Sequence, residues 1–147
     1  MKIRPATAAD LPRVVELLQQ LSLDGARELD ANDSAYARAF AEICSDARQL
    51  IVVIERDGII VGTATLSFLP NLSHGARPVA QLESVVVDEQ ARGSGAGQAL
   101  VHWCLQEAKR RGCFRAQLTS DLRRADAHRF WQQQGFVHTH QGFKQAL

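Results

Sequence analysis

The chain has 147 residues, of which 46% are apolar and 22% charged, and its formal net charge is +1. This size and composition fit one domain over residues 1–147 and argue against wholesale disorder, and the balanced charge argues against a dedicated nucleic-acid binder. No apolar run reaches the roughly 20 residues of a membrane span and the N-terminus lacks the apolar core of a signal peptide, so we expect a cytoplasmic protein.

The N-terminal third predicts one strand and two helices. Residues 2–6 are typical of a short strand. Pro12 favours Asp10 as the N-cap of the first helix, because proline then falls in the first turn, where its missing N–H costs no hydrogen bond. Apolar residues follow at helical spacing. Either Asp33 or Ser34 is suited to cap a second helix.

The middle of the chain is rich in strands. Residues 50–56 are β-branched and almost wholly apolar, and residues 59–68 continue the pattern after Asp57-Gly58, a strong hairpin turn. Residues 71–78 are typical of a loop. Residues 80–87 predict a further strand.

The last third alternates helices and strands. We expect helices over 95–111 and 124–134 and strands over 114–119 and 136–143. The predicted order is β-α-α-β-β-β-α-β-α-β, which is an α/β (α+β) fold with a mixed sheet of about six strands and four helices. The strand–helix–strand unit between residues 85 and 119 predicts a parallel pair with a right-handed crossover.

Three glycines lie between the valine-rich strand and the following helix, in Arg92-Gly93-Ser94-Gly95-Ala96-Gly97. A helix N-terminus with exposed amides attracts phosphate, and glycine lets the backbone adopt conformations that other residues avoid. The ATP-binding P-loop is excluded, because Gln98 and Ala99 stand where that motif needs Lys and a hydroxyl residue. The spacing also differs from the dinucleotide motif GxGxxG.

This segment resembles motif A of the GNAT superfamily, the Gcn5-related N-acetyltransferases. Residues 3–11 resemble the first strand and helix start of that family, residues 82–97 its motif A, and residues 127–136 its motif B. Residues 82–87 and the turn at 112–114 are most similar to the small glucosamine-phosphate N-acetyltransferase type. The resemblance covers essentially the whole chain and implies the GNAT fold.

The resemblance implies acetyl-CoA, or another acyl-CoA, as acyl donor. The pantetheine arm would pair with the main chain of the last strand residues of motif A, and the pyrophosphate would rest on the amides of the glycine loop. A tight turn with no ligand is the alternative. The implied cofactor-binding residues are Val85, Val86, Val87, Arg92, Gly93, Ser94, Gly95, Ala96, Gly97, Gln98, Phe130 and Trp131.

Glu83 is the candidate general base, since it precedes the valines that the resemblance assigns to pantetheine. The alternatives for Glu83 are a solvated carboxylate or a structural ion pair, and His74 is an alternative base. A backbone N–H near Val85 would polarise the thioester carbonyl. Tyr36 either contacts the acceptor or is an ordinary half-buried helix residue.

Two positions depart from the family pattern. Trp131 stands where many members have a tyrosine that protonates the CoA sulfur, and an indole is no practical proton donor. The thiol could leave as a thiolate, or a water or Ser84 could assist. Arg124 replaces a frequent asparagine, and it either reaches the cofactor phosphates or is a solvated surface residue.

The leading hypothesis is therefore an N-acetyltransferase that moves an acetyl group to a primary amine of a small molecule by direct attack. The mixed charges of residues 24–30 are candidates to contact an ionic acceptor. The alternatives are a non-catalytic acyl-CoA-binding module and an enzyme that acylates a protein amine. The resemblance also implies a homodimer, to which Val137 and Phe143 would contribute.

We expect no metal site and no membrane or nucleic-acid partner. The three cysteines Cys44, Cys104 and Cys113 form no CxxC pair, so reduced thiols are expected. His138 and His140 alone do not make a metal site.

Overall fold

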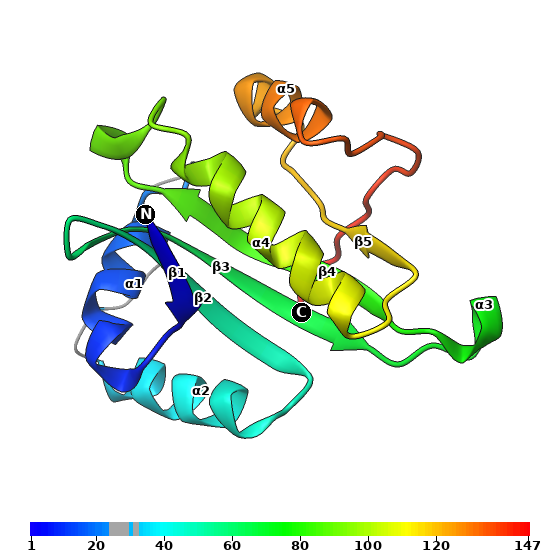
Figure 1. The fold of residues 1–147 in the computed structure, drawn as a ribbon, viewed down its shortest axis with the longest axis horizontal. Coiled ribbons are helices and arrows are strands. Elements are labelled where there is room, and N and C mark those ends of the chain that lie inside the picture. The colour runs from blue at the N-terminus through cyan, green and yellow to red at the C-terminus, as the bar shows by residue number, and fades with distance from the viewer. Residues whose placement is uncertain (24–29, 31–32) are drawn as a thin grey trace.

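A computed structural model describes residues 1–23, 30 and 33–147 of the chain (Figure 1). The strands are β1 (Lys2–Pro5), β2 (Gln49–Arg56), β3 (Ile59–Leu69), β4 (Val79–Val87) and β5 (Arg115–Gln117). The helices are α1 (Leu11–Gln19), α2 (Ser34–Ser45), α3 (Ser73–Ala76), α4 (Ala96–Arg110) and α5 (Ala125–Gln133), with 3₁₀ turns η1 (Ala8–Asp10) and η2 (Glu89–Ala91). In the described part of the chain, no helix is both long and apolar enough to cross a membrane.

The strands form one mixed sheet in the order β1-β2-β3-β4-β5. The first four strands pair antiparallel, and β4 pairs parallel with β5. Helix α4 lies along one face of this sheet (Figure 1), where its Leu100 and Cys104 are buried in one cluster with Ala80 and Leu82 of β4. The helices α1 and α2 cover the other face over β2, β3 and β4, so that Val53 is buried as fully as its neighbours in β2.

The predicted fold class and most of the predicted elements are confirmed. The parallel crossover β4–α4–β5 is present. Asp57 and Gly58 form the expected hairpin turn, with φ of +54° and +79°. Asp33 caps α2 by accepting a hydrogen bond from the Ala35 N–H. Of the two caps that the sequence left open for this helix, Asp33 is the one that the structure uses.

The predicted sixth strand is wrong: residues 136–143 form no strand in the structure. A strand needs a neighbouring strand that accepts its hydrogen bonds, and an apolar pattern alone does not supply one. Val137 and Phe143 are 77% and 91% exposed. The loop over residues 71–78 also differs from expectation, because it contains the short helical turn α3.

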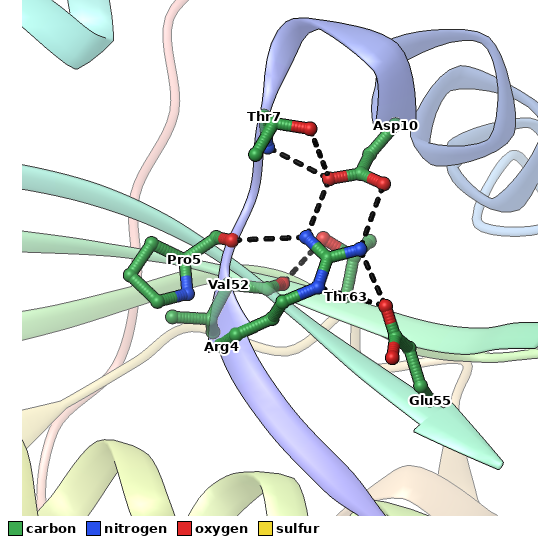
Figure 2. Close-up of polar contacts among 7 residues, drawn as sticks. All are labelled: Arg4, Pro5, Thr7, Asp10, Val52, Glu55 and Thr63. Atoms are coloured by element: carbon green, nitrogen blue, oxygen red, sulfur yellow. Dashed lines mark hydrogen bonds and ion pairs between the residues drawn. The ribbon is translucent and has the colours of Figure 1, made fainter. Parts of the chain in front are cut away.

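Asp10 does not cap α1 with its side chain, although it stands at the N-cap position. Its carboxylate instead accepts hydrogen bonds from Arg4 Nη1 and Nη2 at 2.6 and 2.9 Å, and from the Thr7 N–H at 2.7 Å (Figure 2). Arg4 Nε also donates to Glu55 at 2.7 Å. These contacts tie β1, β2 and the start of α1 together.

Candidate active site

The edge of β4 that faces β5 is only partly paired. Pairing joins Val79–Gln81 to Arg115–Gln117. Beyond Gln81, β4 continues to Val87. The segment that follows β5 instead turns away from β4 toward α5 (Figure 1). An extended ligand can add to such an open strand edge through main-chain hydrogen bonds. The predicted pantetheine-binding residues Val85, Val86 and Val87 lie on this stretch.

A β-bulge interrupts β4 at Ser84. The register runs from Thr65↔Glu83 to Thr63↔Val86, so three steps along β4 face two along β3. Ser84 has a φ of +51°, in the left-handed region. A bulge leaves the extra residue out of the ladder and bends the strand. The bulge at Ser84 therefore lies beside Val85, where the resemblance places the amide that polarises the thioester.

The glycine loop leaves an open helix end beyond β4. Gly93 and Gly95 adopt φ of +77° and +83°, which only glycine adopts without strain. The N–H of Ala99 bonds to the carbonyl oxygen of Gly95 at 3.0 Å and is the first in α4 with a helical partner. The three preceding amides, from Ala96 to Gln98, therefore point out of the helix end, as anion binding requires.

The third glycine of the loop has a different role. A Cβ on Gly97 would lie 3.3 Å from Cζ of Phe130, so the absence of a side chain lets α4 approach α5. Trp131 packs edge-on against Phe130 and Phe136, with ring centroids 5.1 and 5.4 Å apart. The two motif B aromatics thus support the N-terminal end of α4.

Side chains of α1 and of its C-cap residue contact the start of the loop. Arg13 pairs with Asp88 and donates from Nε to the Ile60 carbonyl at 3.2 Å. Gln20 accepts a hydrogen bond from the Glu89 N–H at 3.1 Å. The pKa of Asp88 lies below its ordinary value, mainly because the Gln90 N–H bonds to it and also because of Arg13. Sequence reasoning missed these residues, since nothing in their spacing links α1 to the loop.

A hollow of about 340 Å³ adjoins the loop on the outer side of α4. Its lining residues are Gly95, Gln98, Ala99, His102, Leu105 and Gln134. It offers room for a part of the ligand beyond a pyrophosphate bound at the helix end.

Glu83 is exposed and belongs to a short hydrogen-bonded chain. Gln117 donates from Nε2 to Gln81 Oε1 at 2.9 Å, and Gln81 donates from Nε2 to Glu83 Oε1 at 3.0 Å. Within the described residues Glu83 makes no ion pair. The carboxylate is therefore oriented by an amide and open to solvent, one residue before the bulge.

Other predicted residues lie outside this arrangement. His74 stacks on Phe114 with the ring centroids 4.2 Å apart. This contact lies beyond the N-terminal end of β4, whereas the glycine loop follows its C-terminal end. Arg124 is partly exposed and donates from Nη2 to the carbonyl oxygen of Leu21. Arg92 faces Glu89 at 3.6 Å on the surface. Of the charged segment 24–30, only Asp30 is among the described residues.

Several known proteins are similar to this chain in sequence and in fold. The chain is 30% identical to an aminoalkylphosphonate N-acetyltransferase of Salmonella typhimurium, over 99% of this chain and 91% of the relative. It is 40% identical to a glucosamine 6-phosphate N-acetyltransferase of Trypanosoma brucei brucei over 43% of each chain.

Two solved structures match over nearly their whole length. A protein described as a transcriptional regulator from Bacillus halodurans has 37% identity and a TM-score of 0.92, with 99% of each chain covered. A putative acetyltransferase from Agrobacterium tumefaciens has 32% identity and a TM-score of 0.90, with 100% of each covered. The profile of the acetyltransferase (GNAT) family matches residues 14–136. The predicted family is thereby confirmed: the chain belongs to the acetyltransferase (GNAT) family and is an N-acetyltransferase.

Proposed function

We propose that the protein transfers the acetyl group of acetyl-CoA to a primary amine of a small molecule. The observation that supports this proposal most is that three features follow one another from β4 to the start of α4. They are the open edge of β4, the bulge at Ser84 and the free amides from Ala96 to Gln98. An extended thioester with a pyrophosphate at its far end matches that order. Relatives whose names specify small amine substrates support the acceptor class.

Glu83 is the proposed general base, acting directly or through one water. It takes a proton from the acceptor ammonium, and the free amine attacks the thioester carbon. The amide beside the bulge stabilises the negative charge on the carbonyl oxygen. The C–N bond then forms, the C–S bond breaks, CoA leaves as thiolate, and the second proton of the attacking nitrogen passes to solvent. Trp131 packs against Phe130 and Phe136, and its indole is no practical proton donor, so the thiolate is not protonated from that position.

Replacing Glu83 by Gln tests this role. We expect kcat to fall about 10²-fold or more, while the Kd for acetyl-CoA stays within about twofold. Glu42→Gln, an exposed carboxylate on α2, is the matched control and should leave both values unchanged. Steady-state CoA release and calorimetry measure the two quantities.

An unchanged kcat in Glu83→Gln would refute the assignment of the base. If the wild-type protein binds acetyl-CoA but none of the amines tested causes it to release CoA, the result would favour the alternative, a non-catalytic acyl-CoA-binding module.

The assembly is also proposed as a homodimer. β5 is the last strand in the sheet order, so no described strand pairs with its outer edge, and such edges favour pairing with another chain. Residues 136–147 carry exposed apolar side chains, Val137 and Phe143 among them, and form no strand within the chain. A cytoplasmic location and the absence of nucleic-acid partners stay predictions.

A further inference from the structure

Arg13 on α1 contacts three different parts of the chain. Its Nη2 pairs with Asp88, which follows β4, and its Nε donates to the carbonyl oxygen of Ile60 in β3 at 3.2 Å. Its Nη1 donates to Glu16 Oε2 on the next turn of α1 at 3.0 Å. The side chain is 32% exposed, so most of it is covered. These contacts fix the guanidinium group between α1, β3 and the segment that leads to the glycine loop.

Asp88 uses its two carboxylate oxygens differently. Oδ1 accepts a hydrogen bond from the Gln90 N–H at 2.8 Å and so caps η2, whereas Oδ2 pairs with Arg13. The N–H of Asp88 donates to the Val61 carbonyl oxygen at 2.9 Å, and its own carbonyl oxygen accepts from the Ala91 N–H at 2.9 Å. Asp88 thus joins the end of β4 to η2, and Arg13 holds it from α1.

Hydrogen bonds continue from η2 into the glycine loop. Ala91 is buried, and its carbonyl oxygen accepts from Ser94 Oγ at 2.6 Å and from the Ser94 N–H at 3.3 Å. Gly95 follows directly and is the N-cap of α4, where the free amides lie. A shift of Asp88 would therefore move the start of the proposed pyrophosphate site as well.

The charge of this stretch is unfavourable for an anion. Residues 88–98 contain two carboxylates, Asp88 and Glu89, and one basic residue, Arg92. The side chain of Asp88 is only 13% exposed, so solvent screens its charge less than that of an exposed group. The amides of the helix end attract a pyrophosphate, whereas an unpaired Asp88 would repel it. Arg13 supplies from α1 the positive charge that this stretch lacks.

We infer that Arg13 is a positioning residue for acetyl-CoA binding: it neutralises Asp88 and holds the start of the glycine loop, so that the helix end can bind the pyrophosphate. This inference rests on the proposed function, which takes the pyrophosphate to lie at that loop. Arg13 acts through Asp88 and needs no contact with the ligand.

Calorimetric titration with acetyl-CoA at about 20 mM salt tests the inference, because screening is weak there. We expect Arg13→Gln to raise the Kd about fivefold or more, since the charge that balances Asp88 is lost. The ratio of this Kd to that of the wild type should decrease at about 0.5 M salt. Arg13→Lys keeps the charge and should bind within about twofold of the wild type.

A second substitution separates the effect of the charge from a loss of structure. Asp88→Asn removes the charge and keeps an oxygen that accepts the hydrogen bond from the Gln90 N–H. Arg13→Gln/Asp88→Asn should therefore bind acetyl-CoA more tightly than Arg13→Gln. If Arg13 only stabilised the fold, the double variant would bind no more tightly than the single one.

Arg111→Gln is the matched control. The Arg111 side chain is 27% exposed, pairs with Glu107 and donates to the Ala47 carbonyl oxygen at 2.6 Å, so this variant loses the same charge and the same kinds of contact. Arg111 follows the opposite end of α4, roughly 20 Å along the helix from Gly95. Its Kd for acetyl-CoA should therefore equal that of the wild type.

The inference is overturned if Arg13→Gln binds acetyl-CoA as the wild type does, or if Arg111→Gln loses as much affinity. It is also overturned if the Kd ratio does not change with salt, or if the double variant binds no more tightly than Arg13→Gln. An affinity that depends on Arg13 in a protein that acetylates no amine would refute the proposed transfer alone. Acetylation of an amine with an acetyl-CoA affinity independent of Arg13 would refute the inference alone.

Discussion

At the scale of single residues, Asp10 shows how a charged group stabilises the frame that carries the site. Its carboxylate is nearly buried and receives bonds from Arg4 and Thr7 (Figure 2). The bond from Arg4 is the main reason that the pKa of Asp10 lies well below its ordinary value of 3.8. The ionised form is therefore the one that the fold prefers. The resulting stability is complete above the unfolded-state pKa and is lost as the pH falls through the folded one.

Asp10→Asn should lower the free energy of unfolding at neutral pH by about 1–3 kcal/mol, because Arg4 loses its charged partner. The gap from the wild type should narrow as the pH falls below 3.8, since the Asp10 carboxylate of the unfolded wild-type chain then takes up a proton while that of the folded chain stays ionised. Urea unfolding of both proteins at neutral pH and at about pH 2.5 measures this difference in the free energy of unfolding. Asp33→Asn is the control, since asparagine caps a helix equally well. A gap that does not change with pH would contradict this account.

At the scale of elements, β4 depends on a close approach by β3. A Cβ on Gly62 would lie 2.9 Å from the main-chain oxygen of Val86 and 3.0 Å from Cγ2 of Ile54. Val86 belongs to the strand stretch that would pair with pantetheine. The backbone has little freedom to give way there, because Gly62 is paired with both β2 and β4.

Gly62→Ala should therefore destabilise the protein by about 1–3 kcal/mol, as overpacking does. It should also weaken acetyl-CoA binding, because β4 must shift. Gly142→Ala is the matched control, since its Cβ would meet nothing closer than Cγ2 of Thr119 at 3.7 Å. Thermal unfolding of both variants compares them, and equal midpoints would show that the close approach has no energetic consequence.

The sequence was informative where the chemistry is local. Asp57-Gly58, Asp33 and the positive-φ glycines Gly93 and Gly95 act through their own backbone, and each was predictable. The bulge at Ser84 was not, because it arises from the pairing of β3 with β4. The approach of Gly97 to Phe130 and that of Arg77 to the Phe114 ring join segments that are distant in the sequence. The strand predicted over residues 136–143 was wrong for the same reason, since a strand needs a neighbouring strand to pair with and its own apolar pattern does not supply one.

At the scale of the whole molecule, the open edge of β5 and the exposed C-terminal segment predict an assembly. The wild type should have about twice the mass of one chain in light scattering, as closed two-fold dimers do. Val137→Asp/Phe143→Asp should be monomeric, because both side chains are exposed in one chain and would be buried between two. A wild type that is monomeric at all assay concentrations would contradict the proposed dimer.

The proposed function depends on binding of the acetyl-CoA pyrophosphate by the glycine loop and the N-terminal end of α4. Calorimetric titration with acetyl-CoA, with ATP and NAD as control ligands, tests it most directly in the wild type, Gly95→Ala and Gly58→Ala. The two glycines have φ of +83° and +79°, and neither Cβ would meet an atom within 4 Å, so the backbone strain is matched.

We predict selective binding of acetyl-CoA by the wild type, with Kd in the order of micromolar. Affinity should fall about tenfold or more in Gly95→Ala and stay unchanged in Gly58→Ala, because only Gly95 shapes the open helix end. A folded wild type that does not bind acetyl-CoA, or equal affinities in the two variants, would contradict the claim.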